Sequence, residues 1–345
     1  MRIIAVMACI FFLSLPVGAL ELEAPAVPDS GREWMPQSTD SFTRGLAELL
    51  SKALSALHPD LKEASRVALG IVAAVLMVSV LQSFSPPVRN VSEMAAIGAS
   101  ASLLLLNTNS MIRLASDTIL EMSEYGKLLL PVMTAALAAQ GSITASGAIC
   151  AGTAMFHALL QNMMGSLLVP GIYLYLALRI GGGATGEDLL KQLADLLKNC
   201  MGWILKIMLM VFTTYLSLTR VVSGTTDAAA LKAAKVTMSS FIPVVGGILS
   251  DASEAVLISA GLMKNAAGIY GILAVLALFV HPFFRIGVHY LILKFTSALC
   301  SIFGGKRVCS VLEGFSAALG LLLGMTAAQC MMLLISTVCF MKGVG

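Results

Sequence analysis

Residues 241–271 read FIPVVGGILSDASEAVLISAGLMKNAAGIYG, a stretch that is apolar enough for a membrane but is interrupted by helix breakers and polar groups. Pro243 lacks the backbone N–H that a helix uses, and Gly246 and Gly247 are poor helix formers. Such breaks are tolerated at membrane depth only where protein or water covers the freed backbone groups. The stretch therefore predicts a membrane protein with a broken segment that could serve as a functional site.

The composition of the whole chain is that of a polytopic membrane protein. Of its 345 residues, 58% are hydrophobic and 12% are charged, and the mean hydropathy is +0.90, which lies outside the range of soluble proteins. The formal net charge of +3, without a long basic run, excludes nucleic acid as a partner. The seven cysteines lie in or beside apolar segments without a CxxC spacing, so we expect neither a disulfide framework nor a metal site.

Two segments precede the predicted membrane domain. Residues 1–19 combine one positive charge, a short apolar core and small residues before a polar segment, which is the pattern of a cleaved signal peptide. An uncleaved signal anchor is the alternative. Residues 20–66 then predict an exoplasmic linker and an amphipathic helix that begins near Phe42 and ends near Pro59. This helix would lie on the membrane, on a partner or on the protein's own exoplasmic face.

Residues 67–345 predict an all-α, polytopic membrane domain with about seven to nine membrane segments, some of them short or broken. Residues 128–140 are too few for a full crossing and contain Pro131, so they suit a re-entrant segment or half-helix. The high content of Gly, Ala and Ser in residues 143–160 predicts close packing against a neighbouring helix. The Gly181-Gly182-Gly183 run lacks the strand, lysine and hydroxyl of a nucleotide loop, and predicts a flexible joint.

Two pairs of prolines suggest an internal repeat. Pro131 and Pro243 are 112 residues apart, and so are Pro170 and Pro282. Broken segments at matching positions of two halves occur in transporters that are built from structural repeats. The identities are few, and apolar sequence rich in alanine aligns with itself easily, so the repeat and its absence both stay open.

Ionisable side chains in or near apolar segments are the main candidates for function; they are Lys206, His281, Arg285, His289 and Lys294. A charge at the centre of a bilayer costs about 2.5 kcal/mol or more, so such groups indicate a polar interior, a partner contact or an ion path. Arg285 and Lys294 lie close enough to segment ends to reach the interface instead. His289 lies four residues after Arg285 and therefore shares its helix face.

Asp251 and Glu254 are three residues apart and would share a face if their segment were helical. Two carboxylates suit a cation site or a proton relay, but the run of polar residues from Ser250 to Glu254 favours the solvated turn of a hairpin. The sequence contains no Ser/His/Asp constellation, HExxH motif or metal-ligand cluster. We therefore expect a protein that is not an enzyme and holds no cofactor.

Residues 241–271 also carry a family resemblance. Their Phe-Ile-Pro-Val-Val-Gly-Gly opening, and Lys264-Asn265 followed by alternating Gly and Ala, resemble the signature region of stage III sporulation protein AE of endospore-forming bacteria. The signal peptide, the exoplasmic segment and the spans from about Val67 onward fit that family over nearly the whole chain. The motif itself is specific only in residues 241–271.

The resemblance implies a place and a set of partners. The protein would be a multi-pass subunit of the mother-cell membrane around the forespore, within a transenvelope channel or export complex that late forespore gene expression requires. Its partners would be an ATPase, ring-forming proteins, other membrane subunits, a forespore membrane protein and the lipid bilayer. The family supplies no catalytic residues.

Our hypothesis for a channel or partner contact comprises Pro243, Gly246, Gly247, Lys264, Asn265, Lys206, His281, Arg285 and His289. The alternative function is a self-sufficient secondary transporter, which the proline spacing and the intramembrane Lys206 and His281 favour.

Overall fold

Long runs of apolar residues, with few strand-type alternations, fold into long helices. The computed structural model describes residues 25–39, 41–84, 89–139, 143–241, 246–302 and 306–342, with side chains for 25–39, 41–80, 92–138, 146–219, 266–302 and 307–341. The helices are α2 (Asp29–Arg32), α3 (Phe42–Phe84), α4 (Arg89–Ala139), α5 (Ile143–Met163), the π-helix η2 (Met164–Leu168), α6 (Val169–Thr185), α7 (Asp188–Phe241), α8 (Gly246–Ile302) and α9 (Lys306–Lys342). The predicted signal peptide, residues 1–19, lies outside the described residues.

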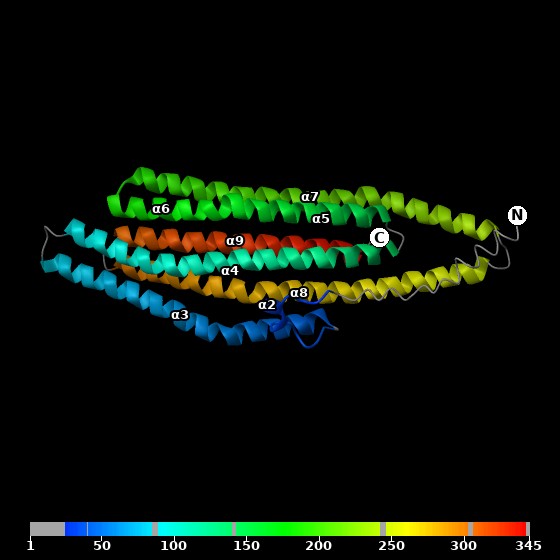
Figure 1. Cartoon of the computed structure of the whole chain (residues 1–345), viewed down its shortest axis with the longest axis horizontal. Helices are drawn as coiled ribbons and strands as arrows, with labels where there is room; N and C mark the ends of the chain where they lie inside the picture. The colour runs from blue at the N-terminus through cyan, green and yellow to red at the C-terminus, as the bar shows by residue number, and fades with distance from the viewer. Residues whose placement is uncertain are drawn as a thin grey trace.

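The long helices lie side by side along one axis (Figure 1). Helix α9 is central, because it packs against α4, α5, α6, α7 and α8. Its inward side chains, such as Phe315, Leu322 and Leu333, are fully buried. Helices α5, α6 and α7 lie at one edge of the bundle, and α3 covers α8 at the other (Figure 1).

Six helical stretches of the described residues are long and apolar enough to cross a membrane. They are Phe42–Val80, Ser92–Ala138, Ser146–Thr185, Asp188–Thr219, Ala266–Ile302 and Arg307–Met341. This confirms the predicted all-α, polytopic membrane fold and is roughly consistent with seven to nine segments. Helix α4 has 51 residues, which at about 1.5 Å per residue gives about 76 Å, more than twice a hydrocarbon core of about 30 Å. The bundle is therefore too long for a single bilayer to cover it entirely.

Three prolines lie inside helices rather than at their ends. Helix α3 continues through Pro59, α4 through Pro131 and α8 through Pro282. The amphipathic helix begins at Phe42 as predicted, but its predicted end near Pro59 is wrong, and so is the half-helix over residues 128–140, which is part of α4. Each of these helices packs along its length against others, and this packing outweighs the cost of a proline in the helix interior.

One proline is accommodated by a change of helix type. The π-helix η2 immediately precedes Pro170, which occupies the first turn of α6. In a π-helix each hydrogen bond spans one more residue than in an α-helix. This wider turn accommodates Pro170, which has no backbone N–H to donate. Helices α5, η2 and α6 consequently form one continuous rod.

Glycines of α5 and α6 serve close packing. A Cβ on Gly152 would collide with the Tyr215 ring of α7, which confirms the predicted tight contact of this Gly/Ala/Ser-rich helix. The predicted joint at Gly181-Gly182-Gly183 is wrong, because these residues belong to α6 and Gly183 lies directly against Val311 of α9. The chain turns instead at Gly186, whose φ of 78° is a left-handed conformation that suits glycine.

The broken stretch that the sequence singled out falls between α7 and α8. Helix α7 ends at Phe241 and α8 begins at Gly246, while residues 242–245, with Pro243, lie outside the described residues. The backbone from Ser250 to Glu254 is helical, so the hairpin turn predicted there is wrong. Helices α7 and α8 extend past the others at this end (Figure 1). Because Pro243 lies outside the described residues, the internal repeat stays a prediction.

Candidate functional site

One stripe of α8 carries three of the candidate side chains. His281, Arg285 and His289 follow one another at intervals of four residues, so a helix places them on one face. This face is turned toward α3, α4 and the N-terminal segment, residues 25–39. We call these three residues and their partners Trp34, Asp60, Glu63 and Asn107 the α8 polar cluster.

Arg285 joins α8 to α3 through two carboxylates. Its Nε lies 3.5 Å from the Oδ1 of Asp60, and its Nη2 donates to the Oε2 of Glu63 at 3.1 Å. Asp60 is buried, because it shares the inward face of α3 with Ala53 and Ala64. A buried carboxylate needs a cationic or hydrogen-bonding partner, so Arg285 fixes the register of α3 on α8.

His281 holds the N-terminal segment onto the bundle. Its ring stacks on the indole of Trp34, with the ring centroids 4.6 Å apart and the planes inclined by 22°. Val27 and Gly31 lie near Leu278, one turn earlier on α8. These apolar and aromatic contacts give the segment a defined position across α8.

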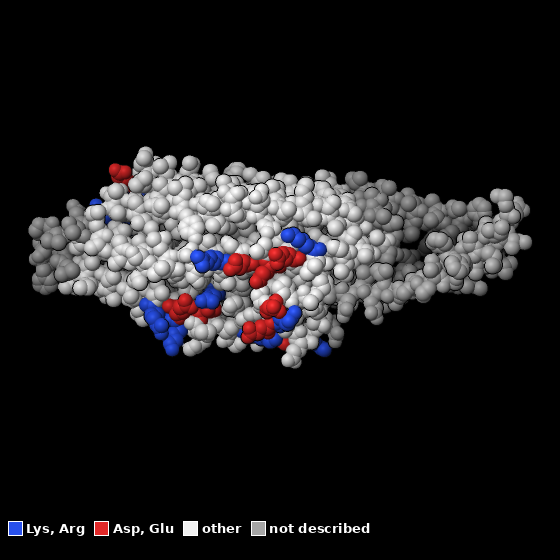
Figure 2. All heavy atoms as spheres, viewed as in Figure 1, with Lys and Arg blue, Asp and Glu red and all other residues white. Residues whose placement is uncertain are grey.

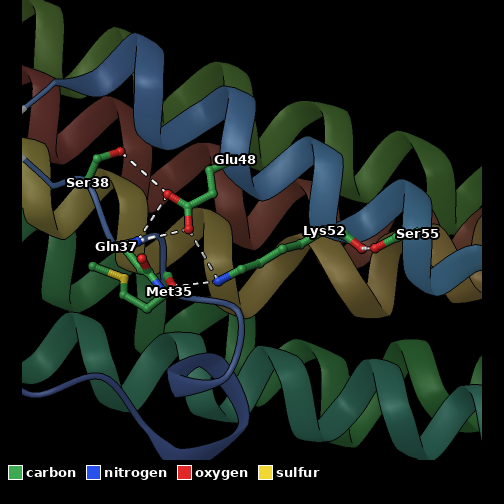
Figure 3. Close-up of polar contacts among 6 residues, drawn as sticks. All are labelled: Met35, Gln37, Ser38, Glu48, Lys52 and Ser55. Atoms are coloured by element: carbon green, nitrogen blue, oxygen red, sulfur yellow. Dashed lines mark hydrogen bonds and ion pairs between the residues drawn. The ribbon is translucent and has the colours of Figure 1, made fainter.

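Polar contacts tie the same segment to the start of α3. The backbone N–H of Gln37 donates to both carboxylate oxygens of Glu48, at 3.0 and 3.1 Å. Lys52 donates to the backbone oxygen of Met35 at 3.1 Å and pairs with Glu48 at 3.5 Å. Both side chains point at the backbone that leads into α3 (Figure 3). The segment is therefore fastened at both α8 and α3.

His289 connects α8 to α4. Its Nδ1 lies 3.0 Å from the Nδ2 of Asn107, and the ring is fully buried. Its Nε2 has no hydrogen-bond partner among the described residues. A buried histidine with one free nitrogen can bind a water molecule or change protonation, but the contact with Asn107 makes His289 a link between two helices.

The arrangement brings together three of the nine predicted residues and not the others. Lys206 lies on the exposed side of α7, away from the cluster. The structure describes only the helical backbone, and not the side chains or their contacts, at Gly246, Gly247, Lys264 and Asn265 of α8. Pro243 lies outside the described residues altogether. For these residues the hypothesis of a channel or partner contact is untested.

Sequence reasoning missed the partners of the cluster. Asp60 comes directly after the predicted end of the first helix, and Asn107 lies in a membrane segment to which no function was assigned. Trp34 lies in the predicted linker. One signal was available for Asp60, because it has helical spacing with the small apolar residues Ala53 and Ala64, which suit the inward face of a helix. No local pattern identifies Asn107 as the partner of a histidine 182 residues away.

A second polar contact lies inside the bundle, between α5 and α9. The Nδ1 of His157 lies 2.9 Å from the Nε2 of Gln329, and both side chains are buried. One turn further along α5, Gln161 accepts a hydrogen bond from Ser123 of α4 at 3.2 Å. The His157 Nε2 and the Gln329 Oε1 have no partner among the described residues. This interior layer was not predicted.

Neither region has the geometry of a metal centre. Among the described residues there is no group of three or more His, Cys, Asp or Glu side chains that could hold a metal ion. The cluster instead combines ion pairs, ring stacking and amide contacts from three helices and the N-terminal segment. Such an arrangement can position helices and respond to a partner that competes for its charges.

Comparison with known proteins gives one consistent result. The family model described as Stage III sporulation protein AE matches residues 35–343. Stage III sporulation protein AE of Bacillus subtilis (strain 168) is 29% identical over 224 residues, which cover 62% of this chain and 54% of that relative. The match thus spans about half the length of the relative. No solved structure matches the chain.

The family match begins at Met35, within the N-terminal segment, and runs past the end of α9, so it includes α3 to α9 and every member of the α8 polar cluster except Trp34. The fold over this range is a bundle of helices long and apolar enough to span a membrane. From this coverage, the chain belongs to the Stage III sporulation protein AE family and has a role in sporulation.

Proposed function

We propose that the protein is a membrane subunit of a multi-protein transenvelope channel or export complex between mother cell and forespore, required for late forespore gene expression. The observation that carries the proposal is the combination of family membership with a bundle longer than one bilayer. A rod of about 76 Å leaves surface beyond a hydrocarbon core of about 30 Å, where other subunits can bind.

The partners would be other membrane subunits, ring-forming proteins, an ATPase and a protein of the forespore membrane. The protein would lie in the mother-cell membrane that surrounds the forespore. It would supply no chemistry of its own, since the polar side chains that the structure describes join helices rather than converge on a substrate position. The alternative, a self-sufficient secondary transporter, would bind a small solute without these partners.

Copurification separates the two functions. A channel subunit extracted from sporulating cells in mild detergent should bring ring-forming and ATPase proteins with it. A transporter should purify alone and bind a solute whose removal changes its thermal stability. Recovery of the chain alone, with solute-dependent stability, would contradict the proposal.

The junction of α7 and α8 is the place where we propose that the passage is lined or another subunit binds. Replacing Gly246 and Gly247 by leucine adds two bulky side chains at the start of α8, where the two helices extend past the bundle (Figure 1). We expect normal membrane insertion but loss of forespore gene expression from a late reporter.

A matched control is Gly287→Leu. Gly287 lies further along α8, and no atom lies within 4 Å of the position of an added Cβ. This variant should insert and support the reporter. Normal reporter expression in the Gly246→Leu/Gly247→Leu strain would remove the proposed role of the junction.

A further inference from the structure

One face of α7 is apolar and uncovered over most of its described length. Its exposed side chains recur at intervals of three, four or seven residues, apart from the adjacent Met210 and Val211; they are Leu189, Leu193, Leu196, Trp203, Ile207, Met210, Val211 and Leu218. A shallow groove of about 450 Å³, lined in part by Cys200 and Trp203, lies along it. We call this surface the α7 face.

Lys206 lies within the α7 face and differs from the other charged residues of α7 whose side chains the structure describes. Asp188 pairs with Lys191 at 2.9 Å, and Asp195 pairs with Lys198 at 3.3 Å. Lys206 is exposed, three residues after Trp203, and has no ion-pair or hydrogen-bond partner among the described residues. An ammonium on an apolar surface that becomes covered needs an acidic partner.

A row of charges follows the exposed side of α4. It consists of Arg113, Asp117, Glu121, Glu124 and Lys127, of which all but Glu121 are exposed. Figure 2 shows these charges as a line across the middle of the visible face, with acidic groups between basic ends. Glu121 accepts a hydrogen bond from Ser30, and none of the five forms an ion pair with another described residue. We call this surface the α4 row.

Lys206 and the α4 row lie at the same height along the bundle. Helices α4, α7 and α9 run in the same direction (Figure 1). Leu205 of α7 contacts Gly324 of α9, and Leu333 of α9 contacts Gly126 of α4. Gly324 precedes Leu333 by nine residues, and the residue nine before Gly126 is Asp117. Because helices rise equally per residue, Leu205 and its neighbour Lys206 are level with the acidic part of the row.

The apolar α7 face and the charged α4 row need different surroundings, lipid for the first and water for the second. A bilayer or an aqueous phase surrounds a bundle equally at a given height. In lipid the exposed charges of the α4 row would be unsolvated, whereas in water the α7 face would be an extended apolar patch. One of the two faces must therefore be covered by protein.

We propose that a second copy of this chain covers both faces, with the α7 face of one copy against the α4 row of the next. Copies inserted in one membrane share their orientation, so residues of equal height meet. Lys206 then pairs with Asp117 and Glu124, while exposed leucines of α4, such as Leu120 and Leu128, pack on the apolar side chains of α7. A two-fold contact between α7 faces would place Lys206 against Lys206, so the contact is head-to-tail, the kind of contact from which rings are built.

The test is the oligomeric state of the full chain expressed alone, in a host without other sporulation proteins. Light scattering in mild detergent should show an oligomer. Lys206→Glu should weaken self-association by about tenfold or more, and so should Asp117→Lys combined with Glu124→Lys, because like charges then meet. Combining all three substitutions should restore the oligomer. Lys62→Glu makes the same charge change on exposed α3 and should have no effect.

A cross-link in membranes provides the second measurement and does not depend on detergent. Two versions of the chain are expressed together with different tags, one with Lys206→Cys and one with Asp117→Cys, and both carry Cys200→Ser. The two introduced cysteines should form a disulfide that joins a copy with one tag to a copy with the other. Lys62→Cys in place of Asp117→Cys should not. A monomeric parent chain, failure of the triple variant to restore the oligomer, or absence of the mixed-tag disulfide would each overturn the inference. Because no other subunit is present, these results do not bear on membership of the larger complex.

Discussion

The Nε of Arg285 lies 3.5 Å from the Oδ1 of Asp60, across 225 residues of sequence, and this pair joins α8 to a buried carboxylate of α3. The Arg285 side chain is 30% exposed and that of Asp60 is 11% exposed, so the pair is partly desolvated. The pair sets the position of α3 along α8, because a shift of α3 by one turn would leave Asp60 buried without a cation.

Asp60→Asn should lower the free energy of unfolding by about 2 kcal/mol. Breaking a fully buried pair costs about 3–5 kcal/mol, and partial exposure of Arg285 reduces this figure. Thermal unfolding in detergent measures the change. The matched control is Glu63→Gln, which removes the 52% exposed partner of the same guanidinium and should cost less than about 1 kcal/mol. Equal losses in the two variants would contradict the assigned difference in burial.

Gly152→Ala should destabilise the contact of α5 with α7 by about 1–3 kcal/mol, as overpacking does. The added Cβ meets the ring of Tyr215, whose hydroxyl donates to the Ala148 oxygen at 2.9 Å and holds the ring in place. Gly147→Ala on the same helix is the control, because it has no atom within 4 Å and should stabilise slightly. Thermal unfolding compares the two, and a less stable Gly147→Ala variant would show that helix propensity is not the controlling factor.

Trp34→Ala should release the N-terminal segment without unfolding the bundle. Loss of the stacking on His281 removes about 0.5–1.5 kcal/mol beyond the lost buried area, which predicts cleavage of residues 25–39 by added protease at about a tenfold higher rate. Arg32→Ala loses only an exposed ion pair with Asp29 and should be cleaved at the parent rate. Unchanged cleavage of Trp34→Ala would mean that Glu48 and Lys52 suffice to hold the segment.

Gln329→Leu should cost about 1–3 kcal/mol in unfolding free energy, because it leaves the buried Nδ1 of His157 without its partner. Replacing both residues by leucine should recover most of that loss, since no buried polar group then lacks a partner. Denaturant unfolding of the two single variants and the double variant gives the coupling energy directly. If the double variant is as unstable as the sum of the single ones, the contact contributes nothing as a pair.

Local features of the sequence were sufficient for the class and the family. Mean hydropathy and charge content identify a polytopic helical membrane protein, because a bilayer restricts composition over every span of about 20 residues. The motif in residues 241–271 identified the family, which the match over residues 35–343 confirms. The rich content of small residues in α5 likewise predicted the close approach that Gly152 makes.

Helix ends were predicted less well, and the reason is energetic. Proline costs a helix interior about 3 kcal/mol, which favours a break at Pro59, Pro131 and Pro282 when only the neighbouring residues are considered. Packing along rods of 43, 51 and 57 residues outweighs that cost in α3, α4 and α8.

The sequence by itself determined that this protein lies in a membrane, that it is helical and which family it belongs to, because these properties depend on composition and on patterns within a few helical turns. Only the tertiary structure decided that Asp60 meets Arg285, that Asn107 meets His289, and that Lys206 lies outward at the height of Asp117. Such relationships join residues that are far apart in the chain. They depend on how whole helices pack, which the helical period of any one segment does not encode.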